Sequence, residues 1–142
     1  MLIEVKVKVL RVIESKTKRF SETYILDREF FAQAEYDVQT LLTKGQEEGT
    51  VDSFEIQSIK ISQVKELAYR LEGESTFIAT FKDVQLDDKG NEKALKYKIL
   101  LWADSLTFAD RRAHDIAKQG YDMTVEGIKQ VDYIYLTEET DE

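Results

Sequence analysis

The strongest constraint on the fold is an internal repeat, because two stretches of this 142-residue chain have similar sequences. "ILDREFFAQAEYDVQTLLTKG" spans residues 25–45, and "LLWADSLTFADRRAHDIAKQG" spans residues 100–120. The same offset of 75 positions keeps the strand that follows each stretch in phase. Two unrelated amphipathic helices would not share this phase, so the sequence predicts an internal duplication. The matched pairs are Leu26 and Leu101, Phe31 and Leu106, Ala34 and Ala109, Leu41 and Ile116, Gly45 and Gly120, Ile56 and Val131, Ile59 and Ile134, and Ile61 and Leu136.

The first repeat is predicted to contain two strands, a helix and a third strand. "LIEVKVKVLRVI" alternates apolar and polar residues, which is typical of a strand with one buried face. "SETYILD" follows the polar turn "ESKTKR" as a second strand, and "SFEIQSIKI" is the third. The helix between them has Asp27 as its expected N-cap and Gly45 as its expected C-terminal stop. Its apolar stripe is Phe30, Phe31, Ala34, Val38, Leu41 and Leu42.

The second repeat shows the same order of elements. "TFIATFKDVQL" pairs with "ALKYKILLW" across the turn "DDKGN". Asp104 or Ser105 caps the next helix, Gly120 ends it, and "QVDYIYL" is the last strand. A β-bulge in each final strand would explain why the apolar phase changes within Ile56–Ile59 and within Val131–Ile134.

The predicted fold class is therefore α+β, with tandem duplicated β-β-α-β units. Each unit would form an antiparallel sheet with a helix packed on one face, and the two units would pair about a pseudo-two-fold axis. Residues 1–136 form one domain, with repeats at 1–62 and 76–136. Residues 63–75 connect them and have the apolar spacing of a short helix, and residues 137–142 form a flexible acidic tail.

Three stretches, "TYILDREFFAQAEYDV", "IQSIKISQV" and "KILLWADSLTFADRRAHDI", resemble an uncharacterised domain family found in Bacteroidota and in the phages that infect them. The resemblance covers nearly the whole chain. It implies the same order in each repeat: a strand, a capping residue, an Ala-rich helix and a strand. Because the family carries no established activity, the resemblance implies a fold and a biological setting but no catalytic residues.

Residue types that form the common catalytic and metal sites are scarce. The chain has no cysteine and one histidine, His114, which is expected to be structural rather than a catalytic base. No glycine-rich phosphate-binding motif occurs. Leu86–Asp88 with Glu92 could bind a metal, but a solvated hairpin tip explains them better, and capping explains Asp27 and Asp104. We therefore expect no enzymatic activity, no cofactor and no metal.

Nothing in the sequence indicates a membrane protein. No apolar run approaches the roughly 20 residues that a spanning helix needs. The N-terminal stretch "MLIEVKVKVL" alternates apolar and charged residues, unlike a signal peptide. We expect a cytoplasmic protein, in the host cytoplasm if a phage encodes it.

Charge is unevenly distributed along the chain. The net charge is −8, yet residues 1–20 contain six basic and two acidic residues, a net +4, so the remainder carries −12. An open sheet face with cations and aromatic rings suits single-stranded nucleic acid, because lysines meet phosphates and bases stack on rings. An acidic tail such as "TEETDE" could compete with DNA for that face and recruit protein partners. The predicted nucleic-acid-binding residues are Lys6, Lys8, Lys16, Lys18, Arg19, Tyr24, Lys96, Lys98 and Trp102.

Purely structural roles would also account for these residues. Alternating lysines keep a half-exposed strand soluble, Trp102 could belong to the core, and an acidic end could simply fray. The alternative function is a protein-interaction module: an adaptor, a phage inhibitor of a host protein, or a virion component. Its surface would be an exposed sheet edge or an acidic helical face, such as Glu35 with Asp37 or Asp110 with Asp115. A homo-oligomer is compatible with either function.

Overall fold

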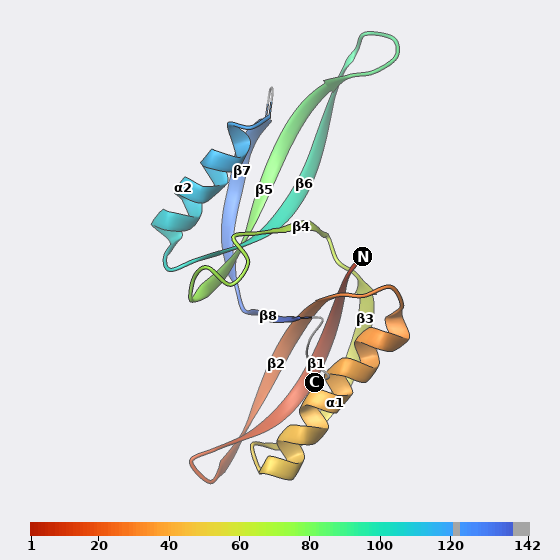
Figure 1. Ribbon diagram of the computed structural model, residues 1–142, viewed down its shortest axis with the longest axis vertical. Coiled ribbons are helices and arrows are strands. Elements are labelled where there is room, and N and C mark those ends of the chain that lie inside the picture. The colour runs from red at the N-terminus through yellow and green to blue at the C-terminus, as the bar shows by residue number, and fades with distance from the viewer. Residues whose placement is uncertain (121–122, 138–142) are drawn as a thin grey trace. The chain divides into compact units, whose positions relative to one another are not determined.

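A computed structural model describes residues 1–120 and 123–137 (Figure 1). The described residues form an α+β fold with two four-stranded sheets, each with one helix packed on it, so the predicted fold class is confirmed. The elements in chain order are β1 (Leu2–Ile13), β2 (Lys16–Asp27), α1 (Phe31–Glu48), β3 (Val51–Ile61), β4 (Val64–Ala68), β5 (Ser75–Leu86), β6 (Glu92–Ala103), α2 (Leu106–Ala117), β7 (Met123–Val131) and β8 (Tyr133–Leu136).

Among the described residues, unit 1 contains 1–62 together with 133–137, and its strand order is β3-β1-β2-β8. The first three strands pair antiparallel, whereas β8 lies parallel to β2. Strand alternation points Ile3, Val5, Val7 and Val9 of β1 toward α1, which buries Ala34, Val38 and Leu42 against them. Other residues of the predicted helical stripe, Phe30, Phe31 and Leu41, are exposed.

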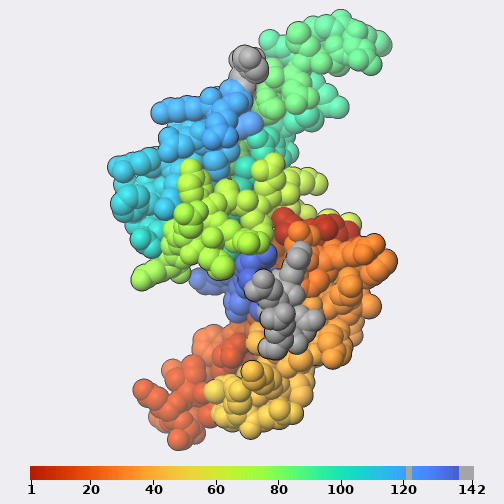
Figure 2. All heavy atoms as spheres, viewed as in Figure 1, coloured from red at the N-terminus to blue at the C-terminus, as the bar shows by residue number. Residues whose placement is uncertain are grey.

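Unit 2 contains residues 63–132 and has the strand order β4-β6-β5-β7. Its core is built from Phe77, Ala79 and Phe81 of β5, alternate residues of β6, and Ala109, Ala113 and Ala117 of α2. In Figures 1 and 2 the turn of the β5–β6 hairpin projects beyond the end of α2. One face of this sheet carries the helix, and the hydrophobic core lies between them.

Each sheet is completed by one short strand that follows the β-β-α-β order of the other repeat: β4 follows β3, and β8 follows β7. The chain leaves unit 1 after Ser62 and places β4 beside β6, and it leaves unit 2 after Asp132 and places β8 beside β2. Both exchanged strands pair parallel to the second strand of a hairpin. The predicted helix in residues 63–75 is therefore wrong, since Val64–Ala68 pair with β6 as a strand. The predicted single strand "QVDYIYL" divides at Asp132.

The two repeats match element by element, although the offset changes along the chain. From β2 to the start of the helix the offset is 75, as Leu26 and Leu101 show by their matching places in the two hairpins. Helix α1 has 18 residues and α2 has 12, so the offset after the helices falls by six to 69. Ile59 faces Val5 and Ile128 faces Ala79 at equivalent places, so the sequence pairing of Ile59 with Ile134 was wrong.

Both third strands contain a bulge at the same structural position. In β3 the register shifts at Gln57, within the predicted Ile56–Ile59 stretch, so that bulge is confirmed. In β7 the shift lies at Glu126, the equivalent residue at offset 69. The predicted bulge within Val131–Ile134 is wrong, because the chain there passes from one sheet to the other.

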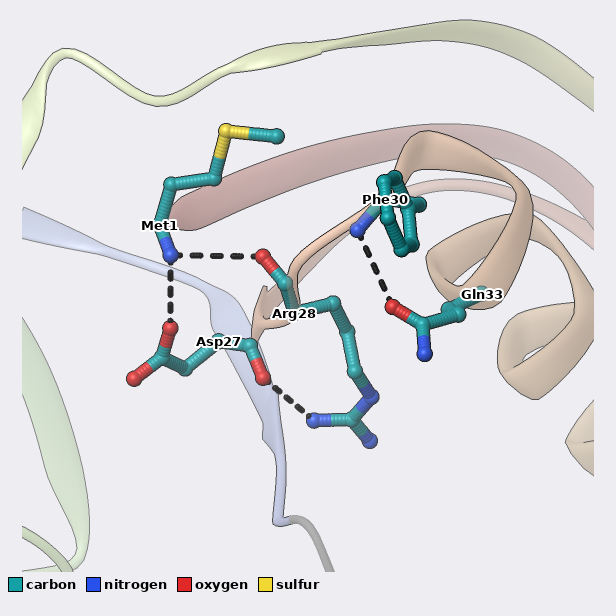
Figure 3. A network of polar contacts seen from close by, with 5 residues as sticks. All are labelled: Met1, Asp27, Arg28, Phe30 and Gln33. Carbon is teal, nitrogen blue, oxygen red and sulfur yellow. Dashed lines mark hydrogen bonds and ion pairs between the residues drawn. The ribbon is translucent and has the colours of Figure 1, made fainter.

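The helix ends differ from those predicted. Phe30 is the N-cap of α1, and its amide donates to Gln33 Oε1 at 3.0 Å, while Asp27 Oδ1 accepts from the Met1 amino group at 3.0 Å (Figure 3). Ser105 caps α2 through a bond from Phe108 N, which settles the alternative in favour of Ser105. Gly49, with φ of 80°, ends α1.

Two glycines expected to stop the helices have other places. Gly45 lies inside α1 and is buried where a Cβ would come 2.6 Å from Val51 Cγ2, so close packing explains the glycine. Helix α2 ends at Ala117, three residues before Gly120. Neither glycine has the left-handed conformation that the sequence interpretation assumed.

Substitution of Leu136 should weaken unit 1, although this residue follows unit 2 in the sequence. Leu136 is buried in the core beside Leu26 and Tyr24, so Leu136→Ala should lower the free energy of unfolding by about 2–5 kcal/mol. Hydrogen exchange measured by mass spectrometry should rise in β1, β2 and α1. A rise confined to β7, the strand preceding it in the chain, would contradict the strand exchange.

Gly73→Ala should destabilise unit 2 through a backbone clash. A Cβ at Gly73 would lie 2.5 Å from the main-chain atoms of Ala103, which cannot move without disturbing β6. Thermal or urea denaturation should show a loss of about 1–3 kcal/mol. Gly127→Ala is the matched control, because a Cβ there meets nothing within 4 Å. Equal stability of the two variants would contradict this packing.

Candidate nucleic-acid interface

The open face of unit 1, opposite α1, carries three of the predicted cations. Lys6 and Lys8 are exposed and alternate with the core residues of β1. Arg19 joins this face because it pairs with Leu10, and it lines a small hollow with Lys8. Glu55 faces Lys8 across the β1–β3 pair, so a carboxylate accompanies the cations.

Lys16 and Lys18 lie on the other side of the same hairpin. They pair with Ile13 and Arg11, whose side chains share the face that α1 covers further along the sheet. Both lysines are exposed near the hairpin turn. The basic cluster expected at residues 16–19 is therefore divided between two faces.

Tyr24 is not on the open face, which corrects its predicted role in base stacking. Its side chain is 1% exposed and belongs to the core of unit 1. Its hydroxyl donates to Glu22 Oε1 at 2.8 Å, and Arg11 binds the same carboxylate through Nε and Nη2, both at 2.6 Å. Burial and the adjacent Glu22 carboxylate raise the pKa of Tyr24.

The open face of unit 2 carries a larger group of lysines. Lys96 and Lys98 lie on it as predicted, and strand pairing adds Lys82, opposite Lys96, and Lys129, opposite Ile78. Like charges directly opposite each other destabilise a sheet, so core stability does not explain Lys82 beside Lys96.

The predicted pairing across "DDKGN" could have placed Lys82 on this face. The turn fixes the β5–β6 register, which sets Lys82 opposite Lys96. Lys129 could not be placed from the sequence, because the bulge at Glu126 sets its face.

Two of these lysines have polar partners within unit 2. Lys96 Nζ lies 3.1 Å from Glu126 Oε2, and Lys98 Nζ donates to Gln63 Oε1 at 2.9 Å. The side chain of Lys96 is nevertheless 64% exposed, so its ammonium group remains accessible to a ligand. Surface pairs of this kind contribute little stability and exchange readily with other anions.

Trp102 lies on the same side of β6 as these lysines but is only 4% exposed. A base could not stack on a ring buried to this extent, so Trp102 does not fit its predicted role. Its carbonyl accepts from Arg112 Nη1 at 2.6 Å, and the Arg112 guanidinium also lies over the Tyr69 ring at 4.7 Å. The surroundings of Trp102 indicate a structural residue.

Two lysine positions on the open face occur in both repeats. Lys8 and Lys82 occupy equivalent places in β1 and β5, each the second residue after the register shift against the third strand of its unit. Lys60 and Lys129 occupy equivalent places in β3 and β7, opposite Glu4 and Ile78. The duplicated fold thus presents a lysine at two matching positions per unit.

The remaining candidates for chemistry have structural surroundings. Asp87 Oδ1 accepts from the amides of Lys89 and Asn91 at 2.9 and 2.8 Å, as expected for a hairpin turn. His114 is exposed on α2, and its Nδ1 lies 2.8 Å from the Asp110 carbonyl oxygen. Within residues 1–120 and 123–137 no group of three His, Cys, Asp or Glu could hold a metal ion.

No helix in the described part of the chain combines the length and the apolar character required to cross a bilayer. The acidic tail expected at 137–142 falls mostly outside the described residues, which end at Thr137. The Thr137 carbonyl accepts from Arg28 Nη2 at 2.8 Å, and Arg28 Nε also pairs with Asp37 at 2.6 Å.

The fold and these surfaces define a duplicated α+β protein with a lysine-bearing open face in each unit. The chain belongs to the family described as Domain of unknown function (DUF4494), whose model matches residues 1–138. The taxonomic range suggested by the sequence resemblance stays a prediction. The search of curated proteins gave no match, and neither did the search of solved structures.

Neutralising Glu22 should reveal how far the partly buried polar group of Arg11, Glu22 and Tyr24 supports unit 1. Burial raises the pKa of Glu22, but hydrogen bonds from Arg11 and Tyr24 outweigh it, so the net pKa is lowered. A lowered pKa contributes stability above the unfolded-state value of about 4.3, and that stability is lost as the pH falls through the folded-state pKa. Glu22→Gln should reduce the free energy of unfolding at pH 7 by about 1–3 kcal/mol.

Urea denaturation between pH 3 and pH 7 measures this effect. The wild-type protein should lose stability below about pH 4.5, and the curve of Glu22→Gln should be flatter. Glu29→Gln is the control, since Glu29 is exposed. Parallel curves for wild type and Glu22→Gln would show that the pKa of the Glu22 carboxylate does not change on folding.

Proposed function

We propose that this protein is a non-enzymatic single-stranded nucleic-acid-binding protein that uses the open faces of its sheets. The observation that carries the proposal is the lysine at equivalent positions of both repeats, Lys8 with Lys82 and Lys60 with Lys129. The proposal includes the setting suggested by sequence resemblance, a Bacteroidota cell or a phage that infects one.

The open face of unit 2 supports this function most strongly. It groups Lys82, Lys96, Lys98 and Lys129 on adjacent strands, where neighbouring strands are about 4.8 Å apart. A flat sheet with several ammonium groups can follow a flexible phosphate backbone without reading base edges. Because Tyr24 and Trp102 are buried, phosphate contacts rather than stacking would supply the affinity.

An affinity that depends on phosphate contacts must fall with salt. For single strands the logarithm of the binding constant decreases by about 0.7 per decade of salt for each phosphate neutralised. The net charge of −8 also opposes indiscriminate binding to duplex DNA, since the acidic remainder of the surface repels it. The acidic residues from 137 onward enter the proposal as a competitor for the lysine faces and a contact for protein partners.

The double variant Lys82→Glu with Lys129→Glu should lose at least ten-fold in affinity for a labelled oligo-dT of about 30 nucleotides. Both substitutions reverse charge on the open face of unit 2, and Lys129 is exposed. Fluorescence anisotropy at low and moderate salt measures the affinity and its salt dependence. A chain ending at Thr137 should bind more tightly than the full chain if the acidic end competes for the lysines.

A matched control changes net charge equally at other places. Lys44→Glu with Lys118→Glu removes two exposed lysines, from α1 and from the end of α2, without touching either open face. This control should keep its affinity. If neither the wild-type chain nor the shortened chain binds oligo-dT at low salt, or if both double variants lose affinity equally, the proposal is wrong.

A second candidate function, a protein-interaction module, is favoured by a different observation. Leu106 is 57% exposed at the start of α2 and lines a groove together with residues of the edge strand β7. An exposed apolar side chain next to an open sheet edge is typical of protein-binding surfaces.

A further inference from the structure

A groove runs between α2 and β7 in unit 2. Its volume is about 480 Å³, and both walls belong to elements that pack directly on each other. No lysine or arginine is among its lining residues. The lining residues are Leu106, Thr107, Asp110 and His114 from α2, and Val125, Glu126, Gly127 and Ile128 from β7.

One wall of this groove is a free sheet edge. Strand β7 is the last strand in the order β4-β6-β5-β7, so one side of its backbone has no partner strand. The bulge at Glu126 interrupts the regular ladder, and Gly127 carries no side chain to cover its own amide and carbonyl. Main-chain groups of the segment Glu126–Gly127 therefore line the groove.

The floor and the opposite wall are apolar. Val125 and Ile128 are half-buried side chains that pack on the core of unit 2, and both line the groove. Leu106 stands above them and is 57% exposed. An apolar side chain entering here would remove three aliphatic surfaces from water at once.

The charged side chain of the groove is acidic. Asp110 stands on the α2 wall with 60% of its side chain exposed, whereas Glu126 lines the β7 wall but turns its carboxylate to Lys96 on the open face, at 3.1 Å. His114 turns its Nδ1 to the Asp110 carbonyl and carboxylate, at 2.8 and 3.3 Å. Lys96 pairs with Glu126 and not with Asp110. The Asp110 carboxylate has no lysine or arginine partner among the described residues. The groove therefore favours a cationic group in its occupant.

The equivalent surface of unit 1 lacks this combination. At the matching positions, the acidic residue Glu126 is replaced by Gln57 and the glycine by Ser58. The residue matching Asp110 is Glu35, whose Oε1 already accepts from Gln39 Nε2 at 3.4 Å. Unit 2 thus differs from its own duplicate chiefly at Gly127, where Ser58 adds a side chain at the matching position of the edge strand.

We propose that the α2–β7 groove binds an extended segment of a partner protein, in which a lysine or arginine lies two positions from an apolar residue. This inference deepens the second candidate function and is independent of nucleic-acid binding. The segment adds to the edge of β7 through main-chain hydrogen bonds at Glu126–Gly127. Residues two apart in a strand face the same side, so its cation meets Asp110 while its apolar side chain packs on Leu106, Val125 and Ile128.

Selection from a phage-displayed library of random twelve-residue peptides tests the proposal. The full chain is the bait, and Leu106→Glu is used to remove peptides that bind elsewhere. The retained peptides should carry a basic residue and an apolar residue two positions apart. Absence of any peptide that requires Leu106, or selection of acidic peptides, would overturn the proposal.

Anisotropy with the retained peptides identifies the contacts. Asp110→Lys should weaken binding at least ten-fold, and the matched control Asp115→Lys on the same helix should not, because Asp115 is exposed and does not line the groove. Leu86→Glu is the control for Leu106→Glu, since Leu86 is 73% exposed at the hairpin end. If Asp110→Lys and Asp115→Lys lost the same peptide affinity, the peptides would be attracted by the overall negative charge of the protein. That result would contradict binding in the groove.

Binding of oligo-dT by the same variants separates this proposal from the nucleic-acid function. Asp110→Lys and Leu106→Glu leave the lysines of the open faces unchanged. Both variants should therefore bind oligo-dT as the wild-type chain does, or slightly more tightly for Asp110→Lys because the net charge becomes less negative. Far-ultraviolet circular dichroism should match the wild type for both exposed substitutions.

Discussion

The pairing of each exchanged strand with a hairpin of the other repeat is the constraint on which the rest of the structure depends. Without β8, the outer side of β2 would be an open edge, and Leu136 would leave the core that contains Leu26. Strand β4 has the matching role beside β6. Two short strands therefore complete both sheets, so neither repeat can satisfy its own backbone hydrogen bonds alone.

The duplicated scaffold carries surfaces that have diverged between its halves. In unit 1, Arg11, Glu22 and Tyr24 form a partly buried polar group, whereas unit 2 stacks Tyr97 on Phe81 with ring centroids 5.6 Å apart. The open faces keep lysine at matching places, which a shared function would explain. The α2–β7 groove has Gly127 on its edge strand, where unit 1 has Ser58. The shared lysines and this divergent groove are the features behind the two separate binding functions that we propose.

Strand alternation and helical spacing predicted most of the secondary structure correctly. Periodicity in "LIEVKVKVLRVI" identifies Val5 and Val7 as core residues because each strand has one covered face. It could not reveal the strand exchange, since Val64–Ala68 has an apolar spacing that fits a short helix and a half-buried strand equally well. The constant offset of 75 failed because α1 is six residues longer than α2, and a shift by an even number of residues leaves the alternation of the following strand in phase by coincidence.

The candidate site was harder to predict than the fold. Lysine positions followed from strand alternation, and alternation from Leu26 also places Tyr24 on the covered face, whereas the burial of Trp102 on the lysine side of β6 depends on tertiary packing. The groove depends on a bulge and on a missing side chain at Gly127, which no local pattern in "VEGIKQ" marks as a binding feature. Sequence periodicity specifies which way a side chain points, and the neighbouring elements decide whether a ligand can reach it.

The strand exchange also sets how this chain could be divided. The boundary between the two sequence repeats and the boundaries between the two folded units are displaced from each other by one strand. A cut after Ala68 would leave one fragment that carries β4 without its sheet and another that carries β8 without its sheet. The two halves are therefore complementary fragments, each holding the piece that the other lacks, rather than two independent copies of one small domain.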